Sequence, residues 1–362
     1  MEVILLKKKQ RRRLLPALLT LALAIFGFLW LQERGNGTYT VETFADGDVS
    51  SRHFESLAEA RTYMERGDNR ALLGPSGEVI DFTGTGIAVT PTDRVTNLYK
   101  DAEFKERQSY VAGGTRLRLV GKGSDHLRVT ISGADVYVPL ADMTLYPDAV
   151  VEKRGYYEMR DGQVLHTVEA NGNLAGTFLV GPAPQEASDR FYTENVRDVF
   201  DSPYQFASIQ SKSPYSAREL DQFLATLGDS PLTGKGDAFK DAEAAFGINA
   251  LFLLAVAGHE SGYGTSAIAR DKNNLFGFKA TDDDPSGNAS TFASVEASVD
   301  AAARLFAEKY VTGSYDRGPF PGNKQEGVNV FYASDPYWGE KVAGTMYRID
   351  RELGLNYLKQ LQ

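Results

Sequence analysis

The sequence of 362 residues contains no cysteine, and this absence excludes several kinds of site. A disulfide framework, a cysteine-ligated zinc ion, an iron–sulfur cluster and a catalytic thiol all need that residue. Histidine is also scarce, and the four histidines lie far apart in the sequence, at His53, His126, His166 and His259. No local histidine cluster is available to ligate a metal, so neither a metal nor an organic cofactor is predicted.

Cations are outnumbered as well, with 39 lysines and arginines against 48 aspartates and glutamates and a formal net charge of −9. Because nucleic-acid binding needs a surplus of cations to contact phosphates, this balance argues against a nucleic-acid partner. Two motifs are also missing. The pair His259-Glu260 begins like the zinc-peptidase pattern H-E-x-x-H, but its fifth position is Tyr263, and no G-x-x-x-x-G-K-[ST] phosphate loop occurs.

The cations that are present are unevenly placed, because six of them fall within the first thirteen residues. Residues 1–13 carry a net charge of +5, and the rest of the chain carries −14. Residues 14–32 have no charge, and as a helix they would span roughly 28 Å, close to the thickness of a membrane core. By the positive-inside rule we predict a cytoplasmic basic tail (1–13), a transmembrane anchor (14–32) and an extracellular remainder.

Two alternatives to an anchor are a cleaved signal peptide and a buried core helix. A signal peptide ends in small residues at its cleavage site, whereas the sequence LWLQERG at the end of this run is bulky and charged. A buried core helix rarely continues for nineteen residues without a charge. We therefore expect a single-span protein of the cell membrane, and the lack of cysteine in its exported part favours a Gram-positive type of surface.

Two short segments follow the anchor. Residues 39–92 contain a capping box that begins at Ser56 and a strand pattern at 79–82, which predict a small mixed α/β segment. Residues 93–150 alternate apolar and polar side chains between glycine turns, which predicts a small barrel of short strands. The pattern from Thr96 to Leu140 resembles a bacterial SH3-like module, a family often found on cell-wall proteins.

Residues 151–190 predict a small β-hairpin unit and linker that is rich in aromatic residues. Tyr156, Tyr157 and Phe178 could form a small core, which we favour, or could stack on sugars. His166 within this unit is expected to be structural.

From 191 to 362 the spacing of apolar residues becomes helical, at 216–227, 237–247, 249–260, 294–311 and 338–353. Asn249 is an expected N-cap for a helix that is apolar almost all round, so this helix should be the buried centre of a mainly helical domain. At its end stands Glu260, where the helix dipole and apolar surroundings should raise the pKa of the carboxyl group. Such a carboxyl can act as a general acid, although it could instead simply pair with a lysine or arginine.

The residues that follow, HESGYGTSAIARDKNNLFGFKA at 259–280, resemble the glucosaminidase domain of glycoside hydrolase family 73. A second segment, Tyr332-Ala333-Ser334-Asp335-Pro336, resembles that family's signature near its C-terminus. The resemblance covers roughly 195–362, and the order of modules is similar to that of streptococcal-type cell-separation glucosaminidases. The resemblance implies a lysozyme-like α+β fold. It also implies an enzyme that cuts the β-1,4 bond after N-acetylglucosamine in peptidoglycan.

The resemblance assigns Glu260 as the general acid and Tyr332 as an active-site tyrosine that positions substrate or water. Asp335 falls on the aspartate of the second signature and has two interpretations. It could take a direct catalytic part, or it could cap a helix that begins near Tyr337, with Pro336 in the first helical position.

Further substrate-binding residues are predicted around this pair. Asn273, Asn274 and Phe276 are expected to shape the floor of the cleft. Tyr263 and Trp338 are candidates for stacking on sugars, and core packing is the alternative for both.

A second catalytic group is needed, because glycosidases ordinarily use two carboxylates. The acidic run at 282–284 is expected on a loop over the cleft, and Asp283 is counted with the substrate-binding residues. The second group is then Asp335, an acid of this run, or the substrate's own 2-acetamido group. Glu296 lies in the first turn of a predicted helix and is interpreted as structural.

These observations predict a membrane-anchored endo-β-N-acetylglucosaminidase for cell-wall remodelling or daughter-cell separation. Its partner would be the glycan strands of peptidoglycan, and a membrane protein of the division or wall machinery would be compatible with the anchor. A muramidase or lytic transglycosylase acting on the same polymer is one alternative. A non-catalytic wall-binding scaffold is the other.

Overall fold

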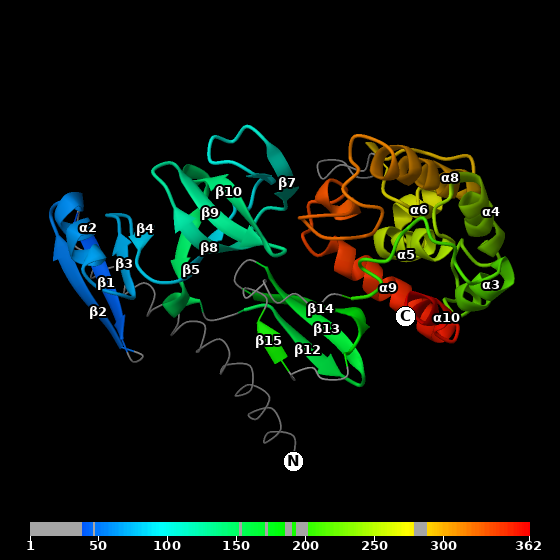
Figure 1. Ribbon diagram of the computed structural model, residues 1–362, viewed down its shortest axis with the longest axis horizontal. Helices are drawn as coiled ribbons and strands as arrows, with labels where there is room; N and C mark the ends of the chain where they lie inside the picture. The colour runs from blue at the N-terminus through cyan, green and yellow to red at the C-terminus, as the bar shows by residue number, and fades with distance from the viewer. Residues whose placement is uncertain are drawn as a thin grey trace, which may run out of the picture. The chain divides into compact units, whose positions relative to one another are not determined.

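A computed structural model describes residues 38–45, 48–151, 154–170, 173–184, 190–192, 202–278 and 288–362 (Figure 1). The basic tail, the expected anchor at 14–32 and the acidic run at 282–284 lie outside this part of the chain. Within the described residues, no helix has both the length and the apolar character needed to cross a membrane. The expectations for the anchor and for Asp283 therefore stay predictions.

The described residues form two compact units. The first takes residues up to 87 together with 144–151, and the second takes 88–143 and 152–362. The sequence instead predicted separate modules that end at 92, 150 and 190. The difference arises because segments far apart in the sequence pack together, which the local periodicity of side chains does not report.

The first unit is a four-stranded antiparallel sheet, in the order β2-β1-β3-β4, with one helix. Ala60 and Met64 of the helix α2 form a small core with Val41 and Leu72 of the sheet. The hydroxyl of Ser56 accepts a backbone N–H of the first turn, as the predicted cap requires. The elements are β1 (Tyr39–Ala45), β2 (Asp48–Phe54), α2 (Leu57–Glu65), β3 (Arg70–Leu73), β4 (Val79–Phe82), β11 (Thr144–Pro147) and the short 3₁₀ turn η2 (Asp148–Val150).

The second unit begins with a sheet whose neighbouring strands are β5-β8-β9-β10-β6-β7. Leu117, Leu127, Val129 and Val138 are fully buried, so the alternating pattern predicted for these strands is confirmed. The resemblance of this β-rich region to an SH3-like module stays a prediction. Its elements are β5 (Gly86–Val89), which begins in the first unit, β6 (Thr96–Tyr99), β7 (Arg107–Val111), β8 (Arg116–Lys122), β9 (His126–Ile131), β10 (Ala134–Pro139) and the 3₁₀ turn η1 (Leu140–Asp142).

A second antiparallel sheet follows, in the order β14-β13-β12-β15. Its small core is formed by Tyr157, Val164 and Val180, with Phe178 packed against them, which confirms the predicted aromatic core for Tyr157 and Phe178. His166 is completely buried, as its structural interpretation requires. The strands are β12 (Tyr156–Arg160), β13 (Gln163–Ala170), β14 (Asn173–Pro182) and β15 (Arg190–Tyr192).

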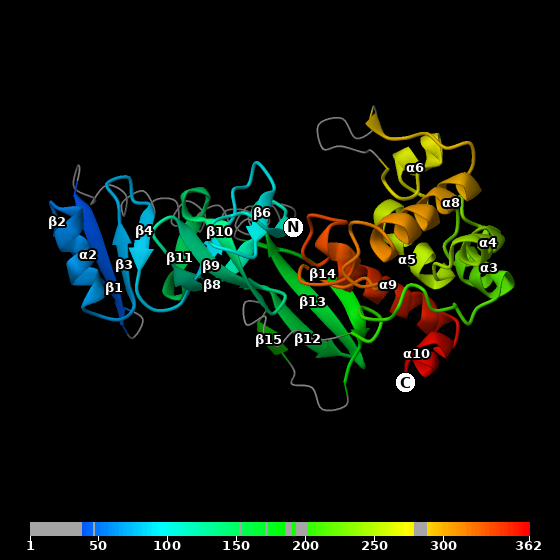
Figure 2. The ribbon, with the colours of Figure 1, turned by 45° about the horizontal axis from the view of Figure 1, so that its top comes forward.

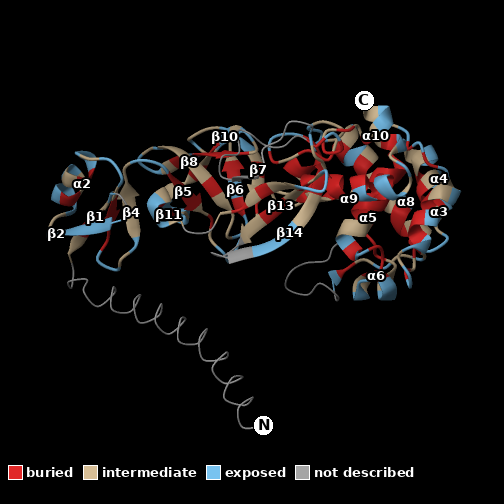
Figure 3. Ribbon diagram, turned by 90° about the horizontal axis from the view of Figure 1, so that it is seen from below, coloured by how far each residue is buried: buried red, intermediate tan, exposed pale blue. Residues whose placement is uncertain are grey.

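The remaining residues form a helical domain around α5 (Figure 3). The side-chain oxygen of Asn249 accepts the N–H groups of Leu251 and Phe252, and every residue from 250 to 257 is buried. The prediction of a capped, central helix is thus confirmed. The elements are α3 (Ala217–Ala225), α4 (Gly236–Phe246), α5 (Ala250–Ser261), α6 (Ala267–Lys272), α8 (Val295–Leu305), the π-helical turn η4 (Phe306–Val311), the 3₁₀ turn η5 (Val328–Val330), α9 (Trp338–Glu352) and α10 (Asn356–Leu361).

Helix α9 connects the helical domain to the second sheet, because it packs against both α5 and β14 (Figure 2). A Cβ atom added to Gly344 in the middle of α9 would lie only 1.8 Å from the carbonyl oxygen of Leu179 in β14. Glycine at this position therefore allows the helix and the strand to approach closely. The start of α9 lies beside the end of α5, where the candidate site is found.

Candidate active site

Glu260 is the penultimate residue of α5, and its side chain reaches solvent. The helix ends at Gly262, whose φ of 59° lies in the left-handed region that favours glycine. The indole N–H of Trp338, the first residue of α9, donates to Oε1 of Glu260 over 2.8 Å. Two helix ends that are 78 residues apart in sequence thus hold one carboxyl group in place.

Burial raises the pKa of Glu260, because protein atoms crowd around the carboxyl group even though its side chain touches solvent. The hydrogen bond from Trp338 stabilises the ionised form and acts in the opposite direction. The negative charge of Asp335 raises the pKa further. The sequence predicted a raised pKa for Glu260, and this direction is confirmed. The main cause of the shift is burial.

Tyr332 packs against η4 and the start of α9. Its ring is stacked on Phe306, with 5.3 Å between ring centroids, and is 4.5 Å from Trp338. Burial raises the pKa of Tyr332 well above its ordinary value, and the charge of Glu260 adds to the effect. The phenol therefore stays protonated, and its hydroxyl can donate a hydrogen bond near Glu260.

Asp335 does not cap α9 in the predicted manner, because the helix begins at Trp338 and its N-cap residue is Tyr337. The Oδ1 atom of Asp335 instead accepts the N–H of Tyr337 over 2.9 Å, in the turn before the helix. Its Oδ2 atom is paired with Nζ of Lys341, one turn into α9. Burial lowers the pKa of the His259 imidazole. The positive charge of Lys341 lowers this pKa further, and the negative charge of Asp335 raises it.

The asparagine pair of the first signature shapes a loop beside Glu260. Asn273 ends α6 in the left-handed conformation and donates to the carbonyl of Phe292 over 3.1 Å. Asn274 is buried, and its amide group bridges the backbone of Phe278 and Ser290. The amide groups of both side chains therefore hydrogen-bond to backbone carbonyls of the loop, so they do not form the floor of an open cleft.

Gly277 in this loop is a site residue that the sequence prediction missed. Its φ is +66°, and an added Cβ would lie 4.0 Å from Oε2 of Glu260. The positive φ favours glycine at this position, and any larger side chain would lie next to the carboxyl group. The one feature of the sequence that could have indicated Gly277 is its position directly after Phe276. Phe276 was itself predicted to line the cleft and is buried.

The proposed sugar platforms need correction, because Tyr263 and Trp338 are only 6% and 1% exposed. The ring of Tyr263 packs in the helical core, 5.6 Å from Phe223, and its hydroxyl contacts Arg348. Trp338 orients Glu260 from within the core. Rings with so little exposed surface cannot offer a face to a sugar. Asp283 lies outside the described residues.

The structure also brings the sheet of the second unit onto the second signature. The hydroxyl of Ser109 in β7 donates to the carbonyl of Val330 over 2.6 Å, and the N–H of Ala112 donates to the carbonyl of Ser334 over 2.9 Å. The hydroxyl of Tyr110 contacts the carbonyl of Phe331 at 3.3 Å. No sequence pattern near residue 110 indicated these contacts, because they link segments more than two hundred residues apart.

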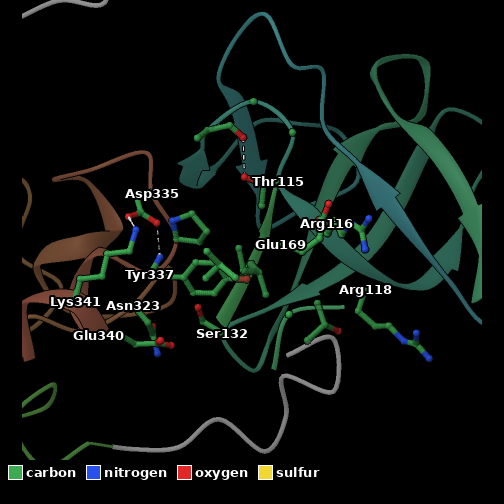
Figure 4. A pocket seen from close by; sticks show the side chains of 18 of the residues that line it. Thr115, Arg116, Arg118, Ser132, Glu169, Asn323, Asp335, Tyr337, Glu340 and Lys341 are labelled. Carbon is green, nitrogen blue, oxygen red and sulfur yellow. Dashed lines mark hydrogen bonds and ion pairs between the residues drawn. The ribbon is translucent and has the colours of Figure 1, made fainter. Parts of the chain in front are cut away.

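A cavity of about 240 Å³ lies at this junction (Figure 4). Its lining includes Thr115, Asp335 and Lys341, and an ion pair between Arg116 and Glu169 with 2.5 Å between Nε and Oε2. Asp335 and Lys341 therefore both border this cavity, and Asp335 also acts on the pKa of Glu260.

A solvent-accessible carboxyl group with a raised pKa, held by an aromatic N–H at the junction of two helices, defines the type of site that glycosidases use for acid catalysis. In agreement with this, residues 236–351 match the Glucosaminidase family model, described as mannosyl-glycoprotein endo-beta-N-acetylglucosaminidase. This part of the chain is therefore a glucosaminidase domain, which is a domain of the glycoside hydrolase class.

Curated relatives carry related names. A "Putative endo-beta-N-acetylglucosaminidase" of Streptococcus pneumoniae serotype 4 is 38% identical over 259 residues, which cover 69% of this chain and 38% of that protein. A "Beta-N-acetylglucosaminidase" of Bacillus subtilis strain 168 is 28% identical over 161 residues, or 40% of this chain and 18% of that protein. The chain thus spans less than two fifths of the length of these relatives.

Among solved structures, Autolysin E of S. aureus is similar with a TM-score of 0.37 and 22% identity, over 55% of this chain and 84% of that chain. Glucosaminidase B of S. aureus is similar with a TM-score of 0.32 and 18% identity, over 42% of this chain and 66% of that chain.

Proposed function

We propose that this protein is a membrane-anchored endo-β-N-acetylglucosaminidase that hydrolyses the β-1,4 bond between N-acetylglucosamine and N-acetylmuramic acid in peptidoglycan. The observation that carries the proposal is the Glu260 carboxyl, within a glucosaminidase domain and with a raised pKa. A raised pKa keeps this carboxyl protonated closer to neutral pH. It can then donate its proton to the leaving glycosidic oxygen.

The neighbouring residues support this role for Glu260. Trp338 fixes the direction of the carboxyl group, and Gly277 places no side chain next to it. Tyr332, which stays protonated, would donate a hydrogen bond from its hydroxyl to a sugar oxygen or to the attacking water and would keep its proton. Each of these groups is set by the fold before substrate binds, so little reorganisation is needed during the reaction.

Asp335 is assigned an electrostatic part in this mechanism. Its carboxylate is engaged by Lys341 and by the N–H of Tyr337, so neither oxygen is free of a protein partner. Its negative charge raises the pKa of Glu260 and favours the positive charge that develops on the sugar ring in an oxocarbenium-like transition state. The group that assists the attack on the anomeric carbon is then an acid of the 282–284 run or the substrate's 2-acetamido group.

The stereochemistry of the product distinguishes these two routes. Direct attack by water with help from a carboxylate inverts the anomeric configuration, whereas participation of the acetamido group retains it. Proton NMR of a defined glycan fragment during the first minutes of hydrolysis reports which anomer forms first. With an acid of the 282–284 run, the α anomer forms first and Asp283→Asn is expected to lower kcat. With the acetamido group, the β anomer forms first.

Bond specificity is tested by identifying the new reducing ends. Purified peptidoglycan is digested with the full-length protein, reduced with borohydride and analysed by mass spectrometry. We expect reduced N-acetylglucosamine at the new ends. Reduced N-acetylmuramic acid would instead identify a muramidase, and a 1,6-anhydro product would identify a lytic transglycosylase. Sugar binding without any new reducing end would identify a non-catalytic scaffold.

A further inference from the structure

Lys324 is a buried titratable residue that the mechanism above does not use. It lies in the segment that leads to the second signature, and it is only 1% exposed. Its Nζ atom donates to the carbonyl of Asn329 over 2.8 Å and to the carbonyl of Ala333. The ring of Tyr110 in β7 faces the ammonium group, with 5.0 Å between Nζ and the ring centroid.

A lysine in such a place is costly to the fold, because an ammonium group loses its hydration when it is buried. Within the described residues, Lys324 has no carboxylate within ion-pair distance to compensate for this loss. Burial lowers its pKa to about 7, and the charge of Asp335 acts in the opposite direction. Two backbone carbonyls, an aromatic ring and the more distant Asp335 carboxylate are therefore the groups that stabilise the charge.

The two carbonyls that Lys324 contacts belong to Asn329 and Ala333, which precede and follow Tyr332 in the turn that carries the second signature. Asn329 closes the same turn from within, since its side-chain amide donates to the carbonyls of Asp335 and Pro336 over 3.1 and 3.2 Å. The backbone N–H of Lys324 donates to the hydroxyl of Ser132, over 3.3 Å, in the turn between β9 and β10. Lys324 thus connects the sheet to the backbone on both sides of Tyr332.

We propose that Lys324 is a positioning residue for the glycosidase reaction, and that its buried amine holds the 329–335 turn so that Tyr332 and Asp335 keep their places beside Glu260. This inference rests on the proposed function. The Lys324 amine keeps the second signature in a fixed position relative to the end of α5, which carries Glu260.

The first test compares Lys324→Met with wild type in the full-length protein kept in mild detergent. Methionine preserves an unbranched apolar stem and removes the amine. Because a displacement of about 1 Å can cost roughly 10²-fold in rate, we expect a loss of that order in kcat with little change in KM. Lys309→Met is the matched control, since Lys309 is exposed and lies on the neighbouring turn η4. A Lys324→Met protein with wild-type kcat would overturn the proposal.

Thermal unfolding gives a readout that does not depend on activity. The ionisable groups facing the Lys324 amine are Tyr110 from β7 and Asp335, which is itself paired with Lys341. A lysine in the unfolded chain has a pKa of about 10.4, so between pH 7 and 10 the unfolded chain binds more protons than the native protein. The wild-type protein therefore gains stability over this range as the pH rises, and Lys324→Met lacks that gain. The Tm of the variant relative to wild type should be highest near pH 6 and should fall toward pH 9. A constant difference in Tm would contradict a buried amine at this position.

The absence of cysteine from the chain allows a sharper comparison of two side chains of equal shape. In a Lys324→Cys protein the thiol is unique, and it can be alkylated in denaturant before refolding. Alkylation with 2-bromoethylamine restores an amine at the end of a lysine-like stem, whereas 1-bromopropane gives the same length without the amine. Wild type taken through the same steps has no thiol to modify and controls for refolding.

We expect the aminoethylated protein to release muropeptides at a rate at least tenfold above that of the propylated protein, with near-UV circular dichroism confirming that both are folded. Equal activity of the two proteins would overturn the proposal for Lys324, whether both are active or both inactive. An inactive wild-type control that has regained its native near-UV spectrum would instead contradict the proposed function itself. The two kinds of failure are therefore distinguishable.

Discussion

The indole N–H of Trp338 is the polar group that holds the Glu260 carboxyl at the end of α5. This hydrogen bond lowers the pKa of Glu260, while burial and the charge of Asp335 raise it. The balance of these effects determines the pH at which the acid loses its proton. A general acid acts in its protonated form, so activity should fall as the pH rises through that pKa.

Trp338→Phe is expected to move this alkaline limit to higher pH, because it removes the effect that lowers the pKa of Glu260. It should also lower kcat, because the carboxyl group loses its orientation. The measurement is the pH dependence of kcat/KM for wild type and variant on a soluble glycan fragment. Tyr347→Phe, a change on the buried side of the same helix, is the control. An alkaline limit that stays in place or moves to lower pH would contradict the assignment of Glu260 as the acid.

The sequence predicted the direction of the pKa shift of Glu260 correctly, whereas it left the places of the surrounding aromatic residues open. The carboxyl at the end of an apolar helix has a physical signature, since helix dipole and burial act on it directly. Tyr263 and Trp338 have no comparable signature, because an aromatic residue beside a glycine can be a platform or a core residue. Only the packing of α9 on α5 makes them part of the core.

At the scale of elements, α9 is the helix on which the site depends. Its first turn carries Trp338, Glu340 and Lys341, which contact three different parts of the protein. Oε1 of Glu340 accepts the hydroxyl of Tyr157 over 2.6 Å, and its Oε2 lies 2.8 Å from Nδ1 of His166. This buried cluster fastens α9 to β12 and β13.

Glu340→Ala should destabilise the second unit, because the Tyr157 hydroxyl and the His166 ring would lose their buried acceptor. The expected cost is about 1–3 kcal/mol for each of the two groups left without a partner. Urea unfolding followed by circular dichroism measures the change. Glu352→Ala at the exposed end of the same helix is the matched control and should have a small effect. Equal stability of the two variants would show that the cluster does not fasten the helix.

The helices could be predicted from sequence and the docking of the sheets could not. Apolar residues at three- and four-residue spacing identified the segments that became α3, α4, α5, α8 and α9. Ser109 and Ala112 contact backbone carbonyls in and beside the second signature. Because every residue has a backbone carbonyl, the sequence does not indicate which ones are contacted. For the same reason, the sequence did not indicate that the described residues on both sides of the predicted boundary at 190 belong to one compact unit.

At the scale of the whole molecule, the charge is divided between a +5 tail and a −14 remainder. Under the proposed export, the acidic remainder of the chain would not be attracted to an anionic wall, and we propose that tethering by residues 14–32 and sugar contacts hold the enzyme on its substrate. A partner in the membrane would be brought near by the same anchor.

Removal of residues 1–37 is expected to release the protein from the membrane, because the longest uncharged run of the sequence, residues 14–32, is lost. The full-length protein should stay in the membrane fraction after extraction with alkaline carbonate, and the truncated protein should be found in the soluble fraction. External protease should digest the full-length protein in intact protoplasts, with only a short basic fragment protected. Extraction of the full-length protein by carbonate, or its protection from protease, would contradict the anchor or its orientation.

The central claim is that the Glu260 carboxyl donates the proton that breaks the glycosidic bond. The most direct measurement is the rate at which Glu260→Gln releases muropeptides from purified peptidoglycan, compared with wild type and with Glu308→Gln, an exposed control on η4. Loss of the acid should lower kcat by roughly 10²- to 10⁴-fold, with an unchanged Tm and near-wild-type activity in the control. Full activity of a folded Glu260→Gln protein would contradict this mechanism.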